Sequence, residues 1–554
     1  MNQMNLDLTP DALIHSRFTA AGINVASLER RDYPGETIFI VRVPPADYEK
    51  ASTLGNAIDH ELNEMGVKGF VTVRKIEAPA ATLRWLKEGV ADPKTNELGS
   101  LLTARSRTSE IQPSLNYIPD TARNIATVTT PRHQLIFGRR GAGKTALMVE
   151  AKRRLIQERC VITWLNLQSL RLETVQRSFV LVCQRICDAM QGCLSETSRT
   201  PHVLSTIATF REHLDQLWAQ TVVSDTEMAR LVPTLQQIIR RFLESTSVRM
   251  FIFIDDLHYL PRPQQPILLD ALHGAVRDCD AWLKIAGIKH LCRWFDPHPP
   301  RGLQTGHDAD HIDLDITLEN PSKAKAFLEE ILVSYARNVG ITSLASIFLN
   351  EALDRLVLAS GAVPRDYLVL SAGAVRQAQR RERARVVGVQ DVNKAAGDAA
   401  KAKLTELEDD ASPSTGTPKI VTALQTIRAF CIDEKRTTYF RVDFRDKEQR
   451  PVEYGLIQDL MDLRLLHLID SSLSDEKEAG RRSEVYMLDL SQFSGQRLKK
   501  KLKVIDFAAG HLVLKETGTT IPVKVGGTSK QRLGLLRRGP LFALASLVNP
   551  ANPA

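Results

Sequence analysis

The chain contains no apolar run close to the ~20 residues that a helix needs to span a bilayer. Its first residues, MNQMNLDLTPDALIH, lack the apolar core of a signal peptide. Internal repeats and low-complexity tracts are also missing. With 43% hydrophobic and 25% charged residues, the composition excludes a fully disordered chain, a collagen and a coiled-coil rod. We therefore expect a cytoplasmic globular protein without a membrane partner.

Cysteine is scarce: the chain has seven, with no CxxC and no metal-ligand spacing to histidine. An odd number without such spacings favours reduced thiols in the cytosol over a disulfide framework. Cys183, Cys187 and Cys193 are close enough to raise the question of a metal site, but no histidine lies between Cys183 and Cys193. Buried helix packing is the favoured interpretation of these thiols.

Positive charge is concentrated at the C-terminal end. The net charge is +8. From Arg497 onward the chain has eleven Lys and Arg residues but only two acidic ones, Asp506 and Glu516, so this segment carries nine excess positive charges. The rest of the chain sums to about −1. Such a segment can neutralise phosphates of nucleic acid or simply keep a protein soluble. Both interpretations stay open.

A length of 554 residues predicts at least three folded units. Strand-like runs alternate with long helical patterns from about residue 118 to 319, which is typical of a parallel α/β sheet with helices on both faces. We expect strands at 134–137, 161–167, 250–255, 282–288 and 311–316. The predicted units are a small N-terminal α/β interaction domain (1–77), a linker (78–117), a parallel-sheet core (118–319) with a helical insertion (about 168–248), a helical lid (320–408), a winged-helix domain (409–494) and a basic tail (495–554).

The N-terminal unit is predicted from a strand at 37–43, a helix at 47–65 and a strand at 70–76. It carries no catalytic constellation, and an unknown protein partner is its expected ligand. The lid is predicted to start at Asn320, since asparagine caps helices and the following Pro321 is tolerated in the first turn. Helices at 420–431 and 454–464, followed by strands at 465–470 and 484–490, outline the winged helix.

The motif GRRGAGKT fits G-x-x-x-x-G-K-[ST] and lies between a predicted strand and a predicted helix. Its glycines let the backbone curl so that N–H groups point at phosphate oxygens, next to the positive end of the following helix. Lys144 is expected to bridge the outer phosphates and the Thr145 hydroxyl to hold Mg²⁺. The expected ATP-binding residues are Gly138, Arg139, Arg140, Gly141, Ala142, Gly143, Lys144, Thr145, Ala146 and Arg365.

The segment MFIFIDD predicts a strand buried on both faces whose carboxyl end delivers two carboxylates beside the glycine-rich loop. Asp255 is expected to share the Mg²⁺ site with Thr145. Asp256 stands where a catalytic base is needed, one methylene shorter than the glutamate often found there. A third motif, GAVPRDYL, places Arg365 after a helix-breaking Gly and Pro, where it can reach the terminal phosphate. An ordinary helix start with a solvated arginine is the alternative.

In this order, the three motifs resemble those of the AAA+ P-loop ATPases, especially the origin-recognition initiator-like branch and the neighbouring STAND signalling ATPases. The resemblance covers about residues 119–490. It implies that Gly138–Thr145 is Walker A, that Asp255 and Asp256 form Walker B, and that Arg365 is the sensor 2 arginine. It also implies catalytic roles for Lys144, Asp256 and Arg365. It further implies a sheet with the P-loop strand central and the Walker B strand two places away.

The chain departs from that family in two respects. The fourth strand runs into Lys289 and His290, where family members carry a polar sensor 1 residue, so that residue is not assigned. The Asp-Asp pair is more similar to the STAND version than to the Asp-Glu pair of strong hydrolases. An arginine finger supplied by a neighbouring subunit is expected before the fifth strand, where Arg293 and Arg301 are the candidates.

The predicted recognition helix of the winged-helix domain is acidic, with Glu453, Asp459 and Asp462 against Arg464. Carboxylates repel DNA, so any DNA contact is expected from the wing and from the basic tail. The wing offers Lys477, Arg481 and Arg482, and the tail offers Arg497, Lys499, Lys500, Lys501, Lys503, Lys524, Lys530, Arg532, Arg537 and Arg538.

The leading hypothesis is an ATP- and Mg²⁺-dependent switch that hydrolyses ATP, forms a homo-oligomer and acts on DNA or a DNA-bound partner. The alternative is a STAND-like signalling scaffold, with slow or no hydrolysis. Its nucleotide state would control assembly and effector recruitment, a layout that the resemblance links to phage-defence proteins. A metabolic kinase is disfavoured, because it would leave the lid, the winged helix and the tail without a role.

Overall fold

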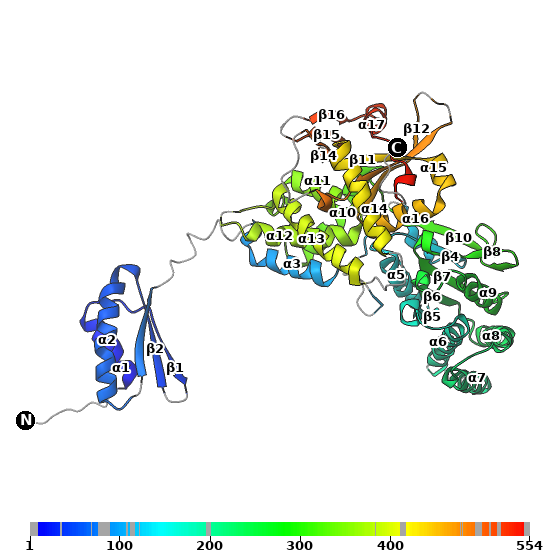
Figure 1. Cartoon of the computed structure of the whole chain (residues 1–554). Coiled ribbons are helices and arrows are strands. Elements are labelled where there is room, and N and C mark those ends of the chain that lie inside the picture. The colour runs from blue at the N-terminus through cyan, green and yellow to red at the C-terminus, as the bar shows by residue number, and fades with distance from the viewer. Residues whose placement is uncertain are drawn as a thin grey trace, which may run out of the picture. The chain divides into compact units, whose positions relative to one another are not determined.

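The computed structural model describes residues 9–33, 36–67, 69–75, 89–106, 109–110, 117–120, 122–195, 201–382, 384–409, 417–476, 478, 480–493, 501–508, 511–517 and 522–547. The chain divides into two compact units, Met1–Glu88 and Gly89–Ala554. Both are drawn in Figure 1, and each is described by itself. Among the described residues, no helix is long and apolar enough to cross a membrane.

The first unit is a three-stranded sheet with two helices packed on one face. Its elements are α1 (Pro10–Ala20), β1 (Ser27–Tyr33), β2 (Glu36–Val43), α2 (Tyr48–Glu64) and β3 (Gly69–Lys75). β2 is antiparallel to β1 and parallel to β3, so α2 is the crossover between β2 and β3. The sequence predicted β2, α2 and β3. It missed α1, which buries only Ile14 and Phe18 and so carries little periodicity.

The predicted linker is wrong in part, because residues 89–106 fold onto the lid of the second unit. A short 3-10 turn, η2 (Gly89–Ala91), leads into α3 (Pro93–Ala104), which Asp92 caps by accepting from the Lys94 N–H. Leu98 and Leu102 of α3 are fully buried in the same core as the lid helices. Residues 78–88 of the predicted linker lie outside the described residues.

The centre of the second unit is a five-stranded parallel sheet in the order β10-β4-β7-β6-β5. The strands are β4 (His133–Phe137), β5 (Val161–Asn166), β6 (Met250–Asp255), β7 (Ala281–Gly287) and β10 (Ala309–Asp313). All five were predicted, and β6 lies two places from β4 as the resemblance implied. β4 itself is second from the edge, and β7 takes the central place.

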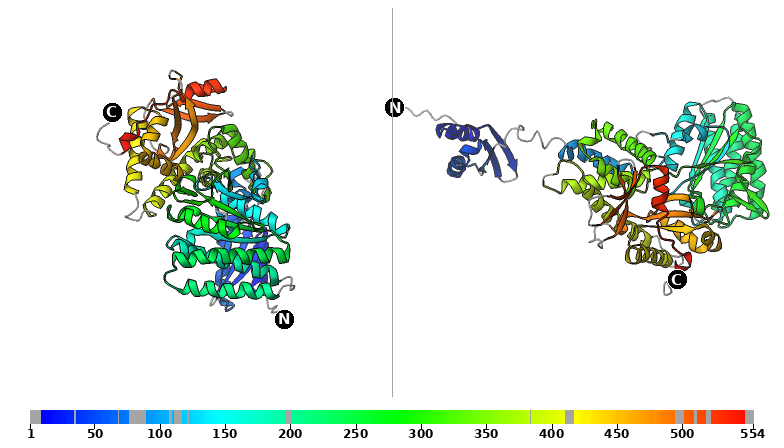
Figure 2. Two further views of the ribbon diagram at one scale, coloured as in Figure 1. Left: turned by 90° about the vertical axis from the view of Figure 1, so that its right-hand side faces the viewer. Right: turned by 90° about the horizontal axis from the view of Figure 1, so that it is seen from above.

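Helices cover both faces of this sheet (Figure 2). Short α4 (Asn124–Val128) and α5 (Lys144–Gln157) pack against one face, where Phe251 and Phe253 of β6 are fully buried. α6 (Val175–Ser195) and α9 (Gln265–Val276) pack against the other face, where Ile252 and Ile254 are fully buried. β6 is apolar on both sides because each side meets a helix layer.

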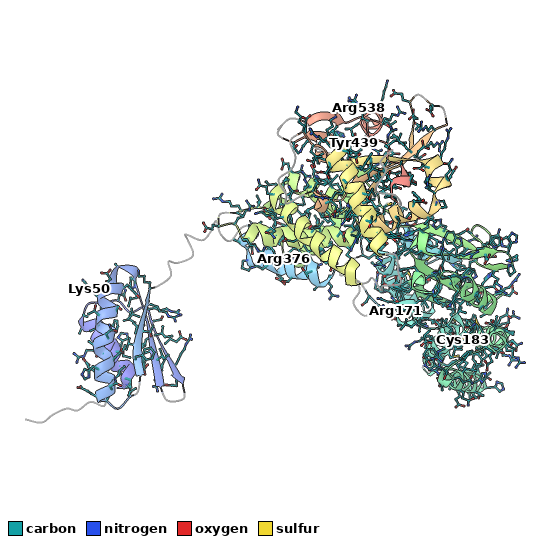
Figure 3. All side chains as sticks on the ribbon, viewed as in Figure 1. Lys50, Arg171, Cys183, Arg376, Tyr439 and Arg538 are labelled. Atoms are coloured by element: carbon teal, nitrogen blue, oxygen red, sulfur yellow. The ribbon has the colours of Figure 1, made fainter. Side chains whose placement is uncertain are left out.

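The predicted helical insertion is present as α6, α7 (Pro201–Ala219) and α8 (Asp225–Thr246) after the 3-10 turn η3 (Leu167–Leu170). α8 starts with a capping box between Ser224 and Glu227. Cys183, labelled in Figure 3, and Cys187 are fully buried in the insertion, where both pack in its apolar core. In the described part of the chain, no group of three or more His, Cys, Asp and Glu side chains is placed to hold a metal ion.

The lid consists of α10 (Pro321–Asn338), α11 (Asn350–Ala359), α12 (Pro364–Gln379) and α13 (Val389–Asp409). Its predicted start is confirmed, since the Asn320 side chain accepts from the Lys323 N–H at 3.2 Å. Between the sheet and the lid, β8 (Phe295–Pro297) and β9 (Pro300–Gly302) form a small antiparallel hairpin before β10.

The winged-helix domain follows the lid. Its elements are α14 (Thr417–Arg428), the π-helical turn η7 (Ala429–Glu434), β11 (Tyr439–Asp443), α15 (Phe444–Gln449), α16 (Pro451–Asp462), β12 (Leu466–Ser474) and β13 (Arg482–Leu488). The strands form a sheet in the order β11-β13-β12. The sequence predicted both main helices and β12 and β13, but it missed β11 and α15, which are only five and six residues long.

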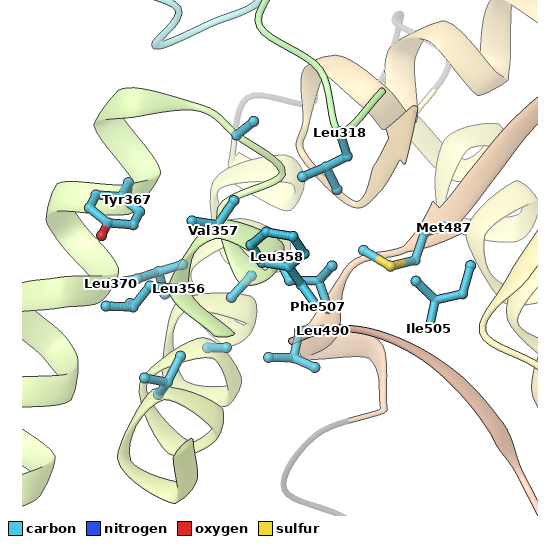
Figure 4. Packing of buried hydrophobic residues seen from close by; sticks show 14 of the residues in the cluster. Leu318, Leu356, Val357, Leu358, Tyr367, Leu370, Met487, Leu490, Ile505 and Phe507 are labelled. Atoms are coloured by element: carbon cyan, nitrogen blue, oxygen red, sulfur yellow. The ribbon is translucent and has the colours of Figure 1, made fainter. Parts of the chain in front are cut away.

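The predicted basic tail is wrong where the structure describes it, because residues 503–508, 511–517 and 522–547 are folded. β14 (Lys503–Ala508), β15 (His511–Glu516) and β16 (Pro522–Gly526) form an antiparallel sheet, followed by α17 (Ser529–Leu536) and the 3-10 turn η9 (Leu544–Leu547). Ile505 and Phe507 of β14 join one apolar core with Leu358 of the lid and Met487 of the winged helix (Figure 4). The apolar runs of these strands are short, as in Leu512–Leu514 of β15, and lysines next to them dominated the sequence pattern.

Candidate functional site

A cavity of about 610 Å³ lies where the P-loop, the lid and the winged-helix domain meet. The P-loop contributes the run from Arg140 to Leu147, and β6 is followed by Asp256 and His258. The lid contributes Arg365, and the winged-helix domain contributes Arg464. Three parts of the chain that are far apart in sequence therefore surround one space.

The P-loop has the backbone shape that a phosphate cradle needs. Gly141 and Gly143 have φ of 85° and 101°, a left-handed conformation that side chains rarely adopt. α5 starts at Lys144, so its first N–H groups have no acceptor within the helix. The Lys144 ammonium donates to the carbonyl oxygens of Gly138 at 2.8 Å and Arg139 at 3.1 Å, and the side chain is 7% exposed.

Arg139 takes a different role from the one predicted. It does not line the cavity: its N–H donates to Asp315 Oδ1 at 2.8 Å, and its Nη2 donates to the carbonyl oxygens of Ile316 at 2.8 Å and Gly361 at 3.3 Å. Arg139 therefore fastens the P-loop to the segment after β10 and to the lid. Gly138 lies behind the cavity as well, with Ala142 Cβ only 3.1 Å from where its own Cβ would be.

The predicted metal ligands are in contact. The Thr145 hydroxyl donates to Asp255 Oδ2 at 2.7 Å across the boundary between α5 and β6. Burial, together with the neighbouring carboxylate of Asp256, raises the pKa of Asp255 to about 6. A bound divalent cation would reverse this shift, because it favours the charged form of the carboxyl.

Asp256 lines the cavity with a left-handed backbone, φ 61°. Its Oδ2 accepts from Asn166 Nδ2 at 3.1 Å, and Asn166 is the last residue of the neighbouring strand β5. Asn166 was not predicted, although its place at the carboxyl end of a strand in the same sheet was a usable signal. The His258 ring lies 4.0 Å from Asp256, and burial lowers the pKa of His258 to about 3, so this ring is neutral.

Arg365 reaches the P-loop from the lid. Its N–H donates to the Gly141 carbonyl at 3.4 Å, and its side chain lines the cavity. The lid is in close contact here, since a Cβ added to Gly141 would lie 2.8 Å from Arg365 Cβ. The structure thus brings Arg365 together with Lys144, Thr145 and Asp256, as the motifs predicted.

The winged-helix domain is the part of the site that the sequence did not predict. Arg464, just after α16, pairs with Asp366 in the first turn of α12. Asp462 Oδ2 lies 3.2 Å from His290 Nε2, and Asp459 Oδ1 lies 3.6 Å from the same nitrogen. Burial raises the pKa of Asp462 to about 6, despite the opposing charge of His290. His290 follows the strand at whose end the sequence offered no sensor 1 residue. Its side chain contacts the winged-helix domain.

The cavity also has apolar lining residues, which the sequence missed because they come from separate segments. Ile118, Phe327, Ile331 and Leu368 line it together with Tyr117 and Tyr335, while Asp120 adds a carboxylate. Apolar and aromatic side chains of this kind can hold a flat nucleobase. Of the arginine-finger candidates, Arg293 lies just before β8 and pairs with Asp296 at 3.0 Å, and Arg301 lies in β9.

The residues present fit a nucleoside triphosphate with Mg²⁺. Gly143 leaves open space above the loop, with no atom within 4 Å of an added Cβ. Mg²⁺ in such sites uses one or two protein oxygens together with substrate phosphates, which matches the Thr145–Asp255 pair.

Residues 202–355 match the family model described as ORC-CDC6-like. This segment runs from α7 to α11 and includes β6, β7 and β10, but not the P-loop or Arg365. The match confirms the expected resemblance over that segment. No curated protein matches the chain.

Among solved structures, the chain is similar to the Orc1 protein of Aeropyrum pernix in complex with DNA, at 15% identity and a TM-score of 0.36, over 68% of this chain and 90% of that one. It is also similar to Cdc6p of Pyrobaculum aerophilum, at 13% identity and a TM-score of 0.30, over 72% and 91%. RuvB of Thermotoga maritima, the Holliday junction branch migration motor, follows at 14% identity and a TM-score of 0.25, over 56% and 72%. At such low scores, no partner or chemistry is transferred from these proteins.

Proposed function

We propose that this chain is an ATP-dependent molecular switch. It contains an ORC-CDC6-like segment, and its parallel sheet has the fold expected of an AAA+ ATPase. The observation that carries the proposal is the convergence of the P-loop, the acidic end of β6 and Arg365 on one cavity. Each group is ordinary alone, but together they match the needs of a bound triphosphate.

In this proposal each residue has a distinct task. Lys144 exchanges its contacts with the P-loop carbonyls for phosphate oxygens, and Thr145 and Asp255 hold Mg²⁺, which neutralises phosphate charge. Asp256, held by Asn166, orients and deprotonates the attacking water. Arg365 places the lid over the phosphates. The nucleotide shifts the lid toward its closed state only if it binds that state more tightly than the open one.

The test uses the purified full chain. Lys144→Ala should lose ATP binding, and Asp256→Asn should keep binding but slow turnover by about 100-fold or more, within the range of general-base catalysis. Unchanged turnover in Asp256→Asn would remove the role assigned to that carboxylate. Lys152→Ala, on the outer part of α5, is the matched lysine control, and it should leave binding unchanged because Lys152 pairs with Glu110.

DNA association is the second part of the proposal, and the structure narrows the residues that can carry it. The C-terminal end of α16 contacts His290, and Arg464 just after it lines the cavity, so this end is not available to DNA. Arg532 donates to the Ile469 carbonyl at 2.9 Å, and Arg537 donates to the Ser474 carbonyl at 2.9 Å, so both brace β12.

Among the wing and tail candidates, the described and exposed side chains are Arg482, Lys501, Lys503, Lys530 and Arg538, the last of which is labelled in Figure 3. Lys477, Arg497, Lys499 and Lys500 lie outside the described residues. Replacing Lys501, Lys503 and Lys530 together by glutamate should weaken DNA binding and flatten its salt dependence, while ATP binding stays intact. DNA binding that survives this change would refute a role of these side chains.

A STAND-like signalling scaffold is the second candidate, and the docking of the winged helix against the cavity favours it. In that case nucleotide controls assembly, with Arg293 or Arg301 meeting a neighbouring subunit. Particle mass measured with a non-hydrolysable ATP analogue, with and without DNA, separates the two. DNA-stimulated turnover supports the first candidate, and assembly that is indifferent to DNA supports the second.

A further inference from the structure

Arg464 is the one cavity-lining residue that the winged-helix domain contributes within the described residues. It follows the end of α16 with a left-handed backbone, φ 59°, which non-glycine residues adopt only at a free-energy cost. This conformation turns the chain between α16 and β12. The side chain is thereby directed to α12 of the lid, where it meets Asp366 next to Arg365.

A purely structural ion pair explains this arrangement poorly. Arg464 is 8% exposed and Asp366 is 5% exposed, and desolvating two such charges cancels much of their mutual attraction. The chain also has another pair of this kind, in which Arg355 of the lid meets Asp506 of β14 at 3.0 Å. That pair also links two parts of the chain, yet neither of its residues lines the cavity.

The charges around Arg464 show what the cavity can accept. Arg105, Arg140, Lys144 and Arg365 line the same space, so with Arg464 five cationic side chains surround it. Among the carboxylates, Asp366 pairs with Arg464 and Asp462 faces His290, while Asp120 and Asp256 line the cavity itself. A guanidinium has five N–H donors, so Arg464 can keep Asp366 and still donate to an oxygen in the cavity.

We propose that Arg464 binds a phosphate of the nucleotide in the cavity, so that nucleotide binding is coupled to the docking of the winged-helix domain on the lid and the sheet. This rests on the proposed nucleotide binding. Asp366 is a positioning residue, because it holds the guanidinium and does not meet the nucleotide. The domain that follows the lid then takes part in recognising the nucleotide bound by its own chain.

The first experiment measures the affinity of the full chain for a fluorescent ATP analogue with Mg²⁺. Arg464→Ala should weaken binding by about 10- to 100-fold, the range expected for one lost hydrogen bond between charged groups. Arg464→Lys keeps the charge and the pairing with Asp366 but loses the fork of donors, so it should fold and bind with an intermediate loss. Arg355→Ala is the matched control and should leave the affinity within about twofold.

The second experiment follows hydrogen exchange of the backbone with and without the ATP analogue. In the unaltered chain, the analogue should slow exchange in residues 361–368 of the lid and in residues 459–467 of the winged helix. In Arg464→Lys the lid segment should stay protected, because Arg365 is intact, while protection of 459–467 should be reduced. A structural ion pair alone would not make exchange at 459–467 depend on nucleotide.

Two results would overturn the proposal. One is an affinity of both Arg464 variants equal to that of the Arg355→Ala control, and the other is exchange at 459–467 that does not respond to the analogue. Either result leaves nucleotide binding itself intact. Failure of the unaltered chain to bind the analogue is a different outcome, since it refutes the proposed function.

Discussion

Replacing Gly141 by alanine should push the lid away from the P-loop. Gly141 has φ of 85°, which costs an L side chain about 1–2 kcal/mol. The added methyl would lie 2.8 Å from Arg365 Cβ and 3.0 Å from Val363 Cγ1, well inside the ~3.5–4.0 Å of a normal carbon contact. Overlap of this size costs about 1–3 kcal/mol. The two terms add to about 2–5 kcal/mol, and moving the lid relieves the second one.

Gly143→Ala is the control, because it carries the strain without the overlap. Gly143 has φ of 101°, and no atom lies within 4 Å of an added Cβ. Hydrogen exchange in residues 361–370, measured without nucleotide, reports the contact between the lid and the P-loop. Exchange there should be faster in Gly141→Ala than in Gly143→Ala. Equal exchange in the two variants would refute the reasoning, because it would mean that the lid does not rest on Gly141 in solution.

Three further predictions concern stability. The buried Lys284 ammonium donates to the carbonyl oxygens of Thr130 and Arg132 and to Gln134 Oε1 at 2.6–2.8 Å. Lys284→Met leaves these acceptors unpaired, so it should lower the free energy of unfolding by about 3 kcal/mol or more, as measured by denaturant unfolding. Phe507→Ala should cost about 3–5 kcal/mol if β14 belongs to the core, and a change below ~1 kcal/mol would argue for a detached tail. Burial raises the pKa of Asp462 to about 6, so the folded chain binds this proton more tightly than the unfolded chain does. The free energy of unfolding should therefore fall as pH rises from about 4 to about 6. Asp462→Asn should lose this part of the pH dependence, whereas parallel stability curves for the two proteins would contradict the prediction.

The sequence predicted the parts of the molecule that depend on local patterns. β6 is apolar at every position before Asp255, and the P-loop has a fixed spacing of glycines, so both could be found without knowing their neighbours. The contact between Thr145 and Asp255 followed from them, because parallel strands and the P-loop meet at one edge of the sheet.

The features that the sequence missed depend on tertiary contacts. Arg464 looked like a lone cation on an acidic helix, and its place in the cavity arises only from the docking of α16 beside His290. Arg139 fitted the loop pattern, yet Asp315, which accepts from its N–H, is 176 residues away. The C-terminal strands were masked by their charge, since the short apolar runs of β14 and β15 are flanked by Lys503 and Lys515 in a segment rich in basic residues.

Calorimetric titration of the purified chain with ATP in Mg²⁺ buffer tests the central claim most directly. The account predicts one ATP bound per chain, with binding lost in Lys144→Ala and retained in Lys152→Ala. No heat of binding to the unaltered chain, or equal binding by Lys144→Ala, would contradict it.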